Sequence, residues 1–178
     1  MNKDIEKVIL TKDQISEKVC EIGKQISKDY AGKELLIVVI LKGAAIFASD
    51  LFRSISIPCI IDYMSVSSYD GTETTGNVKI IKDLDYNIED KDILIVEDII
   101  DSGITLDYLC RLFKIRGAKN VKIATFLDKK VGRKIDVPVD YIGFSVLDEF
   151  LVGYGLDYNE KYRNIPYAGI LKTSIYQK

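Results

Sequence analysis

The side chains best suited to chemistry are concentrated in one stretch, ILIVEDIIDSGITL, at positions 93–106. An apolar run ends there at two adjacent carboxylates, Glu97 and Asp98, and a third carboxylate, Asp101, follows them. The small residues after Asp101 lead into a helix, whose free backbone N–H groups and positive dipole end favour a bound phosphate. The stretch therefore predicts a site for a phosphorylated ligand beside a group of acids.

Each part of this stretch also has an ordinary explanation. Glu97 and Asp98 could belong to a solvated strand end, and the hydroxyl residues Ser102 and Thr105 are common helix caps. Adjacent acids, a third acid and a phosphate-type turn occur together far more rarely than any of them alone. The common nucleotide-binding glycine patterns are missing, because GxxxxGK[ST] is absent and GYG at 153–155 lacks the third glycine of GxGxxG.

Histidine is absent from the 178 residues. Ser-His-Asp triads, Cys-His pairs and HExxH zinc sites all require it, so these catalytic classes are excluded. Proton transfer must then depend on carboxylates, lysine, tyrosine or cysteine. The three cysteines, Cys20, Cys59 and Cys110, form no CxxC pair and indicate neither a disulfide framework nor a zinc site. We expect them to be small buried side chains in a reducing compartment.

Charge and hydropathy restrict the partners. The formal net charge is −2, and bases are mixed with acids along the chain. Nucleic-acid binding needs a clustered basic surface, so nucleic acid is not expected as the main partner. The longest aliphatic run, Leu35 to Leu41, is seven residues, far below the roughly 20 that span a bilayer, and the N-terminal stretch has no signal-peptide core. We therefore expect a cytoplasmic protein that binds no membrane.

Apolar strands alternating with amphipathic helices must position the acids. Strands are predicted at 35–41, 58–66, 78–81, 92–98, 121–128 and 139–146. Helices are predicted at 11–30, 44–52 and 103–117. Thr11 and Gln14 fit a capping box for the first helix, and Gly32 is a plausible stop. The alternation is typical of an α/β fold with a mostly parallel central sheet flanked by helices. We expect residues 1–178 to form a single domain.

One stretch lacks core residues: SSYDGTETTG, at 67–76. Its composition predicts a mobile surface loop. A plain hairpin connection and an active-site lid both fit this loop, and composition alone favours the plain connection.

Four segments, in order along the chain, resemble one family. VEDIIDSG at 96–103 resembles the phosphoribosyl-diphosphate motif of type I phosphoribosyltransferases, in the form typical of the hypoxanthine-guanine branch. LKGA at 41–44 resembles the diphosphate loop of that branch, and the 67–76 stretch resembles its mobile loop. DEFLVGYGLDYNEKYRN at 148–164 resembles its purine and metal segment. The resemblance covers nearly the whole chain and implies a type I phosphoribosyltransferase fold, with a small hood formed by terminal segments.

The resemblance also implies an activity, transfer of the 5-phosphoribosyl group from phosphoribosyl diphosphate to hypoxanthine or guanine. Mg²⁺ would be the cofactor, and a homodimer or homotetramer the assembly. The implied metal ligands are Glu97, Asp98 and Asp157, of which the first two also hold the ribose hydroxyls. Asp101 would lie near purine N7 as the candidate general base.

The remaining implied roles concern the phosphates and the base. The diphosphate would be contacted by Lys42, Gly43, Ser68, Tyr69 and Arg163. The 5′-phosphate would be bound by Ser102, Gly103, Ile104 and Thr105. The purine would be contacted by Phe150 through stacking, by Leu151 through backbone groups and by Lys129 at the 6-oxo group. The family often builds the turn at Lys42 with a non-proline cis peptide bond.

The sequence departs from the family pattern at one position, and two of the implied roles have a structural alternative. Some relatives carry Lys where this chain has Ile104, so its phosphate site would depend more on backbone amides and hydroxyls. Considered without the resemblance, Phe150 would be core packing and Lys129 a solvated surface charge.

Three other functions fit the sequence less well. A non-catalytic RNA-binding regulator on the same fold would carry a basic surface, whereas the sequence pI is about 5.3. A dehydrogenase would need the missing glycine fingerprint. A transferase specific for adenine or pyrimidines is the nearest alternative, but a lysine donor suits a 6-oxo group better than a 6-amino group. The order of preference among hypoxanthine, guanine and xanthine stays open.

Overall fold

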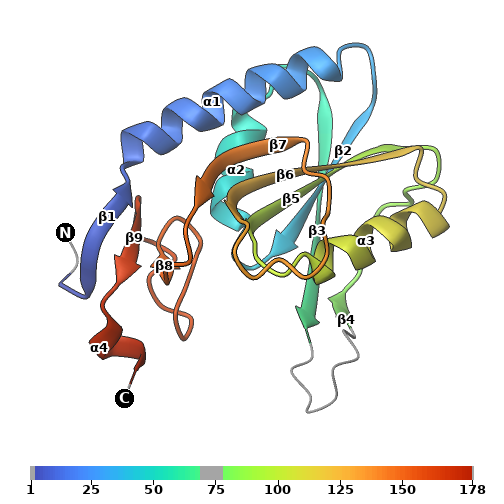
Figure 1. Cartoon of the computed structure of the whole chain (residues 1–178). Helices are drawn as coiled ribbons and strands as arrows, with labels where there is room; N and C mark the ends of the chain where they lie inside the picture. Colours follow the sequence, from blue (N-terminus) through green and yellow to red (C-terminus); the bar gives the residue numbers. More distant parts are fainter. Residues whose placement is uncertain (1–2, 69–77, 178) are drawn as a thin grey trace.

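Two β-sheets organise the structure, a computed structural model that describes residues 3–68 and 78–177 (Figure 1). The larger sheet has six strands in the order β4-β3-β2-β5-β6-β7. They are β2 (Leu35–Leu41), β3 (Cys59–Ser68), β4 (Val78–Lys82), β5 (Asp92–Ile100), β6 (Asn120–Lys129) and β7 (Tyr141–Val146). Neighbours are parallel except β3 and β4, which are antiparallel. The predicted mostly parallel α/β fold is confirmed.

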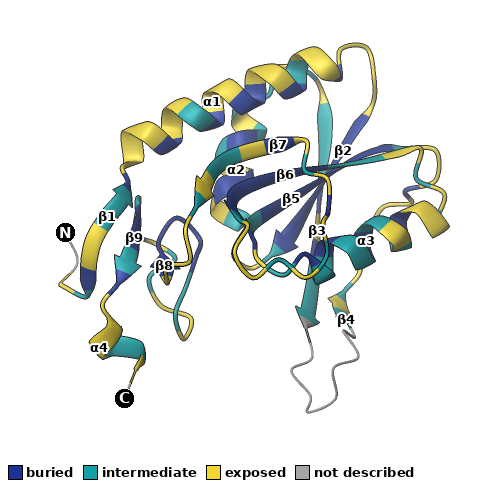
Figure 2. Ribbon diagram, in the orientation of Figure 1, coloured by how far each residue is buried: buried dark blue, intermediate teal, exposed yellow. Residues whose placement is uncertain are grey.

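Helices cover both faces of this sheet (Figure 1). α1 (Lys12–Asp29) and α2 (Ala45–Ser54) lie on one face, and α3 (Ile104–Ile115) lies on the other. Successive residues of a strand point to opposite faces, so β2 contributes to two separate cores. Its side chains divide into Leu35, Ile37 and Val39 toward α1 and α2, and Leu36, Val38 and Ile40 toward α3. Burial on both faces explains the uninterrupted aliphatic strands, which Figure 2 shows at the centre of the molecule.

Local signals set the start of the first helix. The Thr11 hydroxyl accepts the N–H of Gln14, and the Gln14 side chain accepts the N–H of Thr11, so the predicted capping box is confirmed. The helix runs from Lys12 to Asp29 between the cap residues Thr11 and Tyr30, which agrees with the predicted range of 11–30. Gly32 lies in the turn that follows, with a φ of 74°.

A hood of three short antiparallel strands stands beside the main sheet (Figure 1). It consists of β1 (Ile5–Leu10), β9 (Ala168–Leu171) and β8 (Leu151–Val152), and it is followed by α4 (Thr173–Tyr176). Its own small core consists of Ile5, Val152, Ile165 and Leu171. The expected hood of terminal segments is confirmed, although none of its strands was predicted individually.

Three further expectations concern the surface. No helix within the described ranges is long and apolar enough to cross a membrane. Cys59 and Cys110 are partly buried, but Cys20 is exposed, so the expectation of burial is wrong for that residue. The predicted loop at 67–76 falls almost entirely outside the described residues.

Candidate active site

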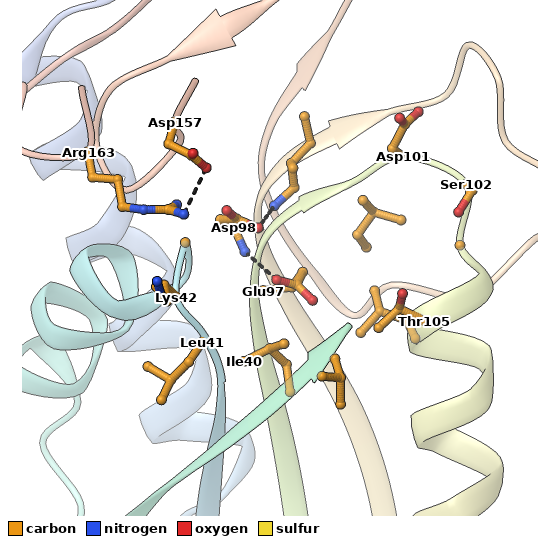
Figure 3. A pocket seen from close by; sticks show the side chains of 16 residues that line it. Ile40, Leu41, Lys42, Glu97, Asp98, Asp101, Ser102, Thr105, Asp157 and Arg163 are labelled. Carbon is orange, nitrogen blue, oxygen red and sulfur yellow. Dashed lines mark hydrogen bonds and ion pairs between the residues drawn. The ribbon is translucent and has the colours of Figure 1, made fainter. Parts of the chain in front are cut away.

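A cavity of about 470 Å³ opens at the carboxyl ends of β2 and β5. These strands are parallel neighbours, so their ends meet at one edge of the sheet, where ligands bind in open α/β folds. The polar side of the lining comes from Lys42, Gly43, Glu97, Asp98, Asp101, Ser102, Gly103, Thr105, Asp157 and Arg163. Figure 3 shows Asp157 and Arg163 on one side, Asp101, Ser102 and Thr105 on the other, and Glu97 and Asp98 between them.

The turn after β2 approaches Asp98 of β5 so closely that a larger residue than Gly43 would have to displace one of them. A Cβ added to Gly43 would overlap the Asp98 carboxylate. The requirement is steric, because Gly43 is not among the glycines with positive φ. The Leu41–Lys42 peptide bond just before it is cis. The turn places Gly43 directly against Asp98, and Lys42 also lines the cavity.

Glu97 and Asp98 differ in environment. Glu97 is buried and accepts the backbone N–H of Asp98 at 3.1 Å. Burial, and then the charge of Asp98, raises the pKa of Glu97 well above its usual range. The Asp98 carboxylate accepts the N–H of Ile99 at 2.8 Å and faces the turn at Gly43. Both acids sit on a central strand, which holds them rigidly at the cavity.

The turn from β5 into α3 presents backbone N–H groups to the cavity. Gly103 precedes the helix with a left-handed φ of 80°, and a Cβ there would collide with the carbonyl oxygen of Ile135. The hydroxyl of Ser102 accepts the N–H of Ile104 at 3.4 Å. First-turn N–H groups lack intrahelical partners, and the helix dipole adds partial positive charge, so the turn suits a phosphate. Ile104 itself does not line the cavity.

Carboxylates hold both cations of the cavity. Arg163 lies 2.8 Å from Asp157 and donates to the carbonyl oxygen of Gly155 at 2.7 Å. The ammonium group of Lys42 lies 3.2 Å from Glu160. The hydrogen bond from Lys42 lowers the pKa of the Glu160 carboxyl. A diphosphate bound here would compete with these acids for the same two cations.

Lys129 stands where β6 ends, next to the turn after β5. Its side chain is only 17% exposed, and its ammonium group lies 3.3 Å from Asp101 and 3.0 Å from Asp148. Partial burial lowers the pKa of Lys129, but the hydrogen bonds with Asp148 and Asp101 outweigh burial and raise it overall. The alternative of a solvated surface lysine is therefore wrong.

Phe150 and Leu151 belong to the hood and lie outside the cavity lining. The Phe150 ring stacks on Tyr176, with centroids 4.7 Å apart, and meets Tyr158 edge-on at 5.6 Å. Phe150 remains 37% exposed, so it is not a core residue. Leu151 is buried and pairs with Ile170 in the hood sheet.

The acids fit one mode of magnesium binding. Glu97, Asp98 and Asp157 line the same cavity and offer the oxygen ligands that Mg²⁺ prefers. Within the described ranges, no three His, Cys, Asp or Glu side chains are gathered closely enough to hold a metal by themselves. Mg²⁺ is usually bound by one or two carboxylates together with waters and substrate phosphates, and these residues match that pattern.

Most residues singled out from the sequence thus meet in one cavity, and Lys129 joins them through its ion pair with Asp101. The side chain of Ser68 and all of Tyr69 lie outside the described residues. Sequence reasoning missed Asp148 and Glu160, which pair with Lys129 and Lys42. Both acids fall within the 148–164 segment, but no local pattern marks them as partners of distant lysines.

Comparisons with known proteins agree with this geometry. The phosphoribosyl transferase domain model matches residues 7–159. A hypoxanthine-guanine phosphoribosyltransferase of Bacillus subtilis (strain 168) is 51% identical over 178 residues, 99% of each protein. A bifunctional protein TilS/HprT of Listeria monocytogenes is 50% identical over the whole chain, which spans only 28% of that relative's length. The crystal structure of a hypoxanthine phosphoribosyltransferase from Staphylococcus aureus is 49% identical, with a TM-score of 0.96 over 100% of this chain and 97% of that one.

Proposed function

The chain belongs to the phosphoribosyl transferase domain family, in its hypoxanthine-guanine branch, and we propose that it transfers the 5-phosphoribosyl group from phosphoribosyl diphosphate to hypoxanthine or guanine. IMP or GMP and diphosphate would be the products, as in purine salvage. The cavity at β2 and β5 carries the proposal, because cations, acids and an open helix N-terminus share one space there. Each group complements one part of phosphoribosyl diphosphate.

The charged residues would stabilise both halves of the departing bond. Loss of diphosphate places positive charge on the sugar and negative charge on the leaving group. Lys42 and Arg163 would exchange their carboxylate partners for phosphate oxygens. Glu97 and Asp98 would lie by the ribose and favour its positive charge. Mg²⁺, when bound, supplies further positive charge at the leaving group.

Asp101 and Lys129 would act on the base. The two charged groups are 3.3 Å apart, so a purine whose 6-oxo group accepts from Lys129 brings its N7 toward Asp101. Asp101 would take the N7 proton as the new bond to the sugar forms at N9. Phe150 would stack on the ring, and the backbone of Leu151 would contact its edge. The N–H groups from Ser102 to Thr105 would hold the 5′-phosphate meanwhile.

A direct assay tests the activity. The protein is incubated with phosphoribosyl diphosphate, Mg²⁺ and one of hypoxanthine, guanine, xanthine or adenine. IMP and GMP should form, and adenine should be a poor substrate, because its 6-amino group cannot accept from Lys129. Failure to form nucleotide from both hypoxanthine and guanine would overturn the proposal, and AMP as the main product would favour the adenine-specific alternative.

Metal removal tests the cofactor. The acids at the cavity would repel a polyanionic substrate without a divalent cation, so excess chelator should stop turnover and added Mg²⁺ should restore it. Full turnover after complete metal removal would contradict this role.

Domain organisation, location and assembly form the last part of the proposed function. We propose that residues 1–178 act as one phosphoribosyltransferase domain in the cytoplasm, as a homodimer or homotetramer that binds neither nucleic acid nor membrane. The pairing of β1 with β9, from opposite ends of the described chain, supports the single domain, and the net charge of −2 supports a partner other than nucleic acid. Sedimentation velocity at several protein concentrations would measure the assembly.

A further inference from the structure

One guanidinium group, that of Arg133, lies where the ends of β5 and β6 meet. Its Nε donates to the carbonyl oxygen of Asp101 at 2.8 Å, and its Nη2 lies 3.3 Å from the carbonyl oxygen of Ile100. The same Nη2 reaches the Asp128 carboxylate at 2.5 Å and the carbonyl oxygen of Lys129 at 3.3 Å. A single planar group therefore contacts the backbone of both residues proposed to act on the purine.

We propose that Arg133 is a positioning residue, which fixes Asp101 relative to Lys129 by holding the backbone of both strand ends. The inference rests on the proposed function, in which these two side chains act on N7 and on the 6-oxo group of one base. Arg133 does not line the cavity and touches no reacting atom in this scheme. It would act only through the two residues that it holds.

The exposure of the Asp101 side chain explains why its backbone must be held in place. The Asp101 side chain is 58% exposed, so packing does little to fix its carboxylate. The position of the Asp101 backbone then determines which positions its carboxylate can reach. Lys129 is more enclosed, but it is drawn toward both Asp101 and Asp148. A fixed backbone separation would keep the ammonium group and the general base at the spacing of O6 and N7.

A simpler role for Arg133 is to neutralise Asp128. That carboxylate is nearly buried, with a side chain 3% exposed, and the Arg133 side chain is only 13% exposed. Charge neutralisation alone would need no particular orientation. The guanidinium instead directs Nε at the Asp101 carbonyl, and Nη2 at the Asp128 carboxylate and the carbonyls of Ile100 and Lys129. Lysine cannot reproduce this rigid, planar arrangement of donors.

Backbone hydrogen bonds from the residues after Arg133 also connect this segment to the turn after β5. The N–H groups of Lys134 and Ile135 both donate to the carbonyl oxygen of Ser102, each at 3.0 Å. Gly103 lies directly against the carbonyl oxygen of Ile135. The 133–135 segment thus holds the proposed phosphate turn as well as Asp101, and Arg133 anchors that segment to β6 through Asp128.

Three variants separate positioning from neutralisation. Arg133→Met removes the fork, Arg133→Lys keeps the charge beside Asp128, and Arg111→Met removes an exposed arginine that pairs with Asp107 on α3. For each, thermal unfolding is measured together with kcat and the KM values for hypoxanthine and phosphoribosyl diphosphate. Arg133→Met should lose roughly 10- to 100-fold in kcat/KM for hypoxanthine, the scale of a misplaced catalytic group. Arg133→Lys should recover stability but not kcat, and Arg111→Met should match the wild type.

Two results would overturn the inference. One is wild-type turnover in Arg133→Lys, because charge would then be sufficient. The other is a loss of activity in Arg133→Met that equals its unfolded fraction, which would mark a structural role alone.

Amide hydrogen exchange supplies a readout that does not depend on turnover. Arg133→Lys should speed exchange at residues 101–104 more than in β2, and unchanged exchange at 101–104 would contradict positioning. A wild-type protein that makes no nucleotide would instead refute the proposed function, and the exchange result would still decide the role of Arg133.

Discussion

Each cation of the site is held by a carboxylate of the same chain. The pairs are Lys42 with Glu160, Arg163 with both Asp157 and Glu160, and Lys129 with both Asp101 and Asp148. A substrate phosphate or a 6-oxo group bound as proposed would therefore compete with carboxylates rather than with water alone. Substrate affinity will reflect a difference between two sets of charge-assisted contacts.

Glu160 is an exposed competitor for the cations proposed to bind diphosphate. Replacing it with Gln leaves Lys42 without its carboxylate, so Glu160→Gln should lower the KM for phosphoribosyl diphosphate and tighten inhibition by diphosphate. The pair is exposed, so the change should be modest, roughly two- to five-fold. Steady-state kinetics with added diphosphate would measure both effects. Glu17→Gln, which changes an exposed acid on α1, serves as the control. A higher KM would mean that Glu160 holds Lys42 in place instead of competing for it.

Lys129 should determine the class of purine. A charge-assisted hydrogen bond contributes about 1.5–3 kcal/mol, so Lys129→Ala should lower kcat/KM for hypoxanthine and guanine by roughly 10- to 200-fold. The weak use of adenine should fall much less, since its 6-amino group cannot accept the bond. Lys130→Ala, at the exposed neighbouring position, should change neither. Equal losses for oxo and amino purines would remove the proposed recognition role.

Protonation of Lys129 should not limit this preference near neutral pH. Its pKa lies above the ordinary value of 10.5, because the carboxylates of Asp148 and Asp101 outweigh its partial burial. The ammonium group is then charged throughout the neutral range. The ratio of hypoxanthine to adenine efficiency should stay constant from about pH 6.5 to about pH 8, well below the ordinary lysine pKa.

Among the secondary elements, those with strong local signals were predictable. The aliphatic run of β2 and the turn from β5 into α3 carry their signal within a few residues, and both appear as expected. The strand β8 has only two residues, and β1 and β9 pair across almost the whole length of the chain. Their existence depends on a partner that no local pattern specifies, so the sequence alone did not reveal them.

The contact between the turn after β2 and the end of β5 can be tested at Gly43, which lies directly against Asp98. Ala at position 43 would drive its Cβ into Asp98, so Gly43→Ala should displace either the carboxylate or Lys42. We expect roughly a 100-fold loss in kcat/KM, the effect of a shift of about 1 Å in a catalytic group.

Gly32→Ala provides the contrasting control. Gly32 has a φ of 74° but no neighbour within 4 Å of an added Cβ. The substitution should therefore cost about 1 kcal/mol of stability through left-handed strain and leave kinetics unchanged. Thermal unfolding and steady-state assays on both variants separate the two effects. Wild-type activity in Gly43→Ala would show that the turn can retreat without consequence.

Across the whole molecule, the proposed site divides between the main sheet and the hood. The sheet supplies Glu97, Asp98 and the phosphate turn, whose residue types and spacing predicted them from the sequence. The hood supplies Phe150 and the 157–163 loop, whose place depends on how β9 pairs with β1 and β8. Arg133 and Tyr176 escaped sequence reasoning, because each matters only through a contact made in the folded chain.

Tyr176 tests whether the far end of the described chain reaches the purine site. Its ring stacks on Phe150 at an interplanar angle of 21°, so it would support the ring proposed to stack on the base. Aromatic pairs contribute about 0.5–1.5 kcal/mol beyond their burial, and Tyr176→Ala should therefore raise the KM for hypoxanthine roughly two- to ten-fold. The KM for phosphoribosyl diphosphate should not change.

Tyr176→Phe keeps the ring and should behave as the wild type, and so should Tyr86→Ala, which removes an exposed tyrosine from another part of the surface. Initial-rate kinetics with each substrate varied in turn would separate the two KM values. A lower KM for hypoxanthine in Tyr176→Ala would reverse the interpretation, because Tyr176 would then cover the face of Phe150 that the purine needs. Equal rises in both KM values would mean that Tyr176 stabilises the hood as a whole rather than the stacking ring.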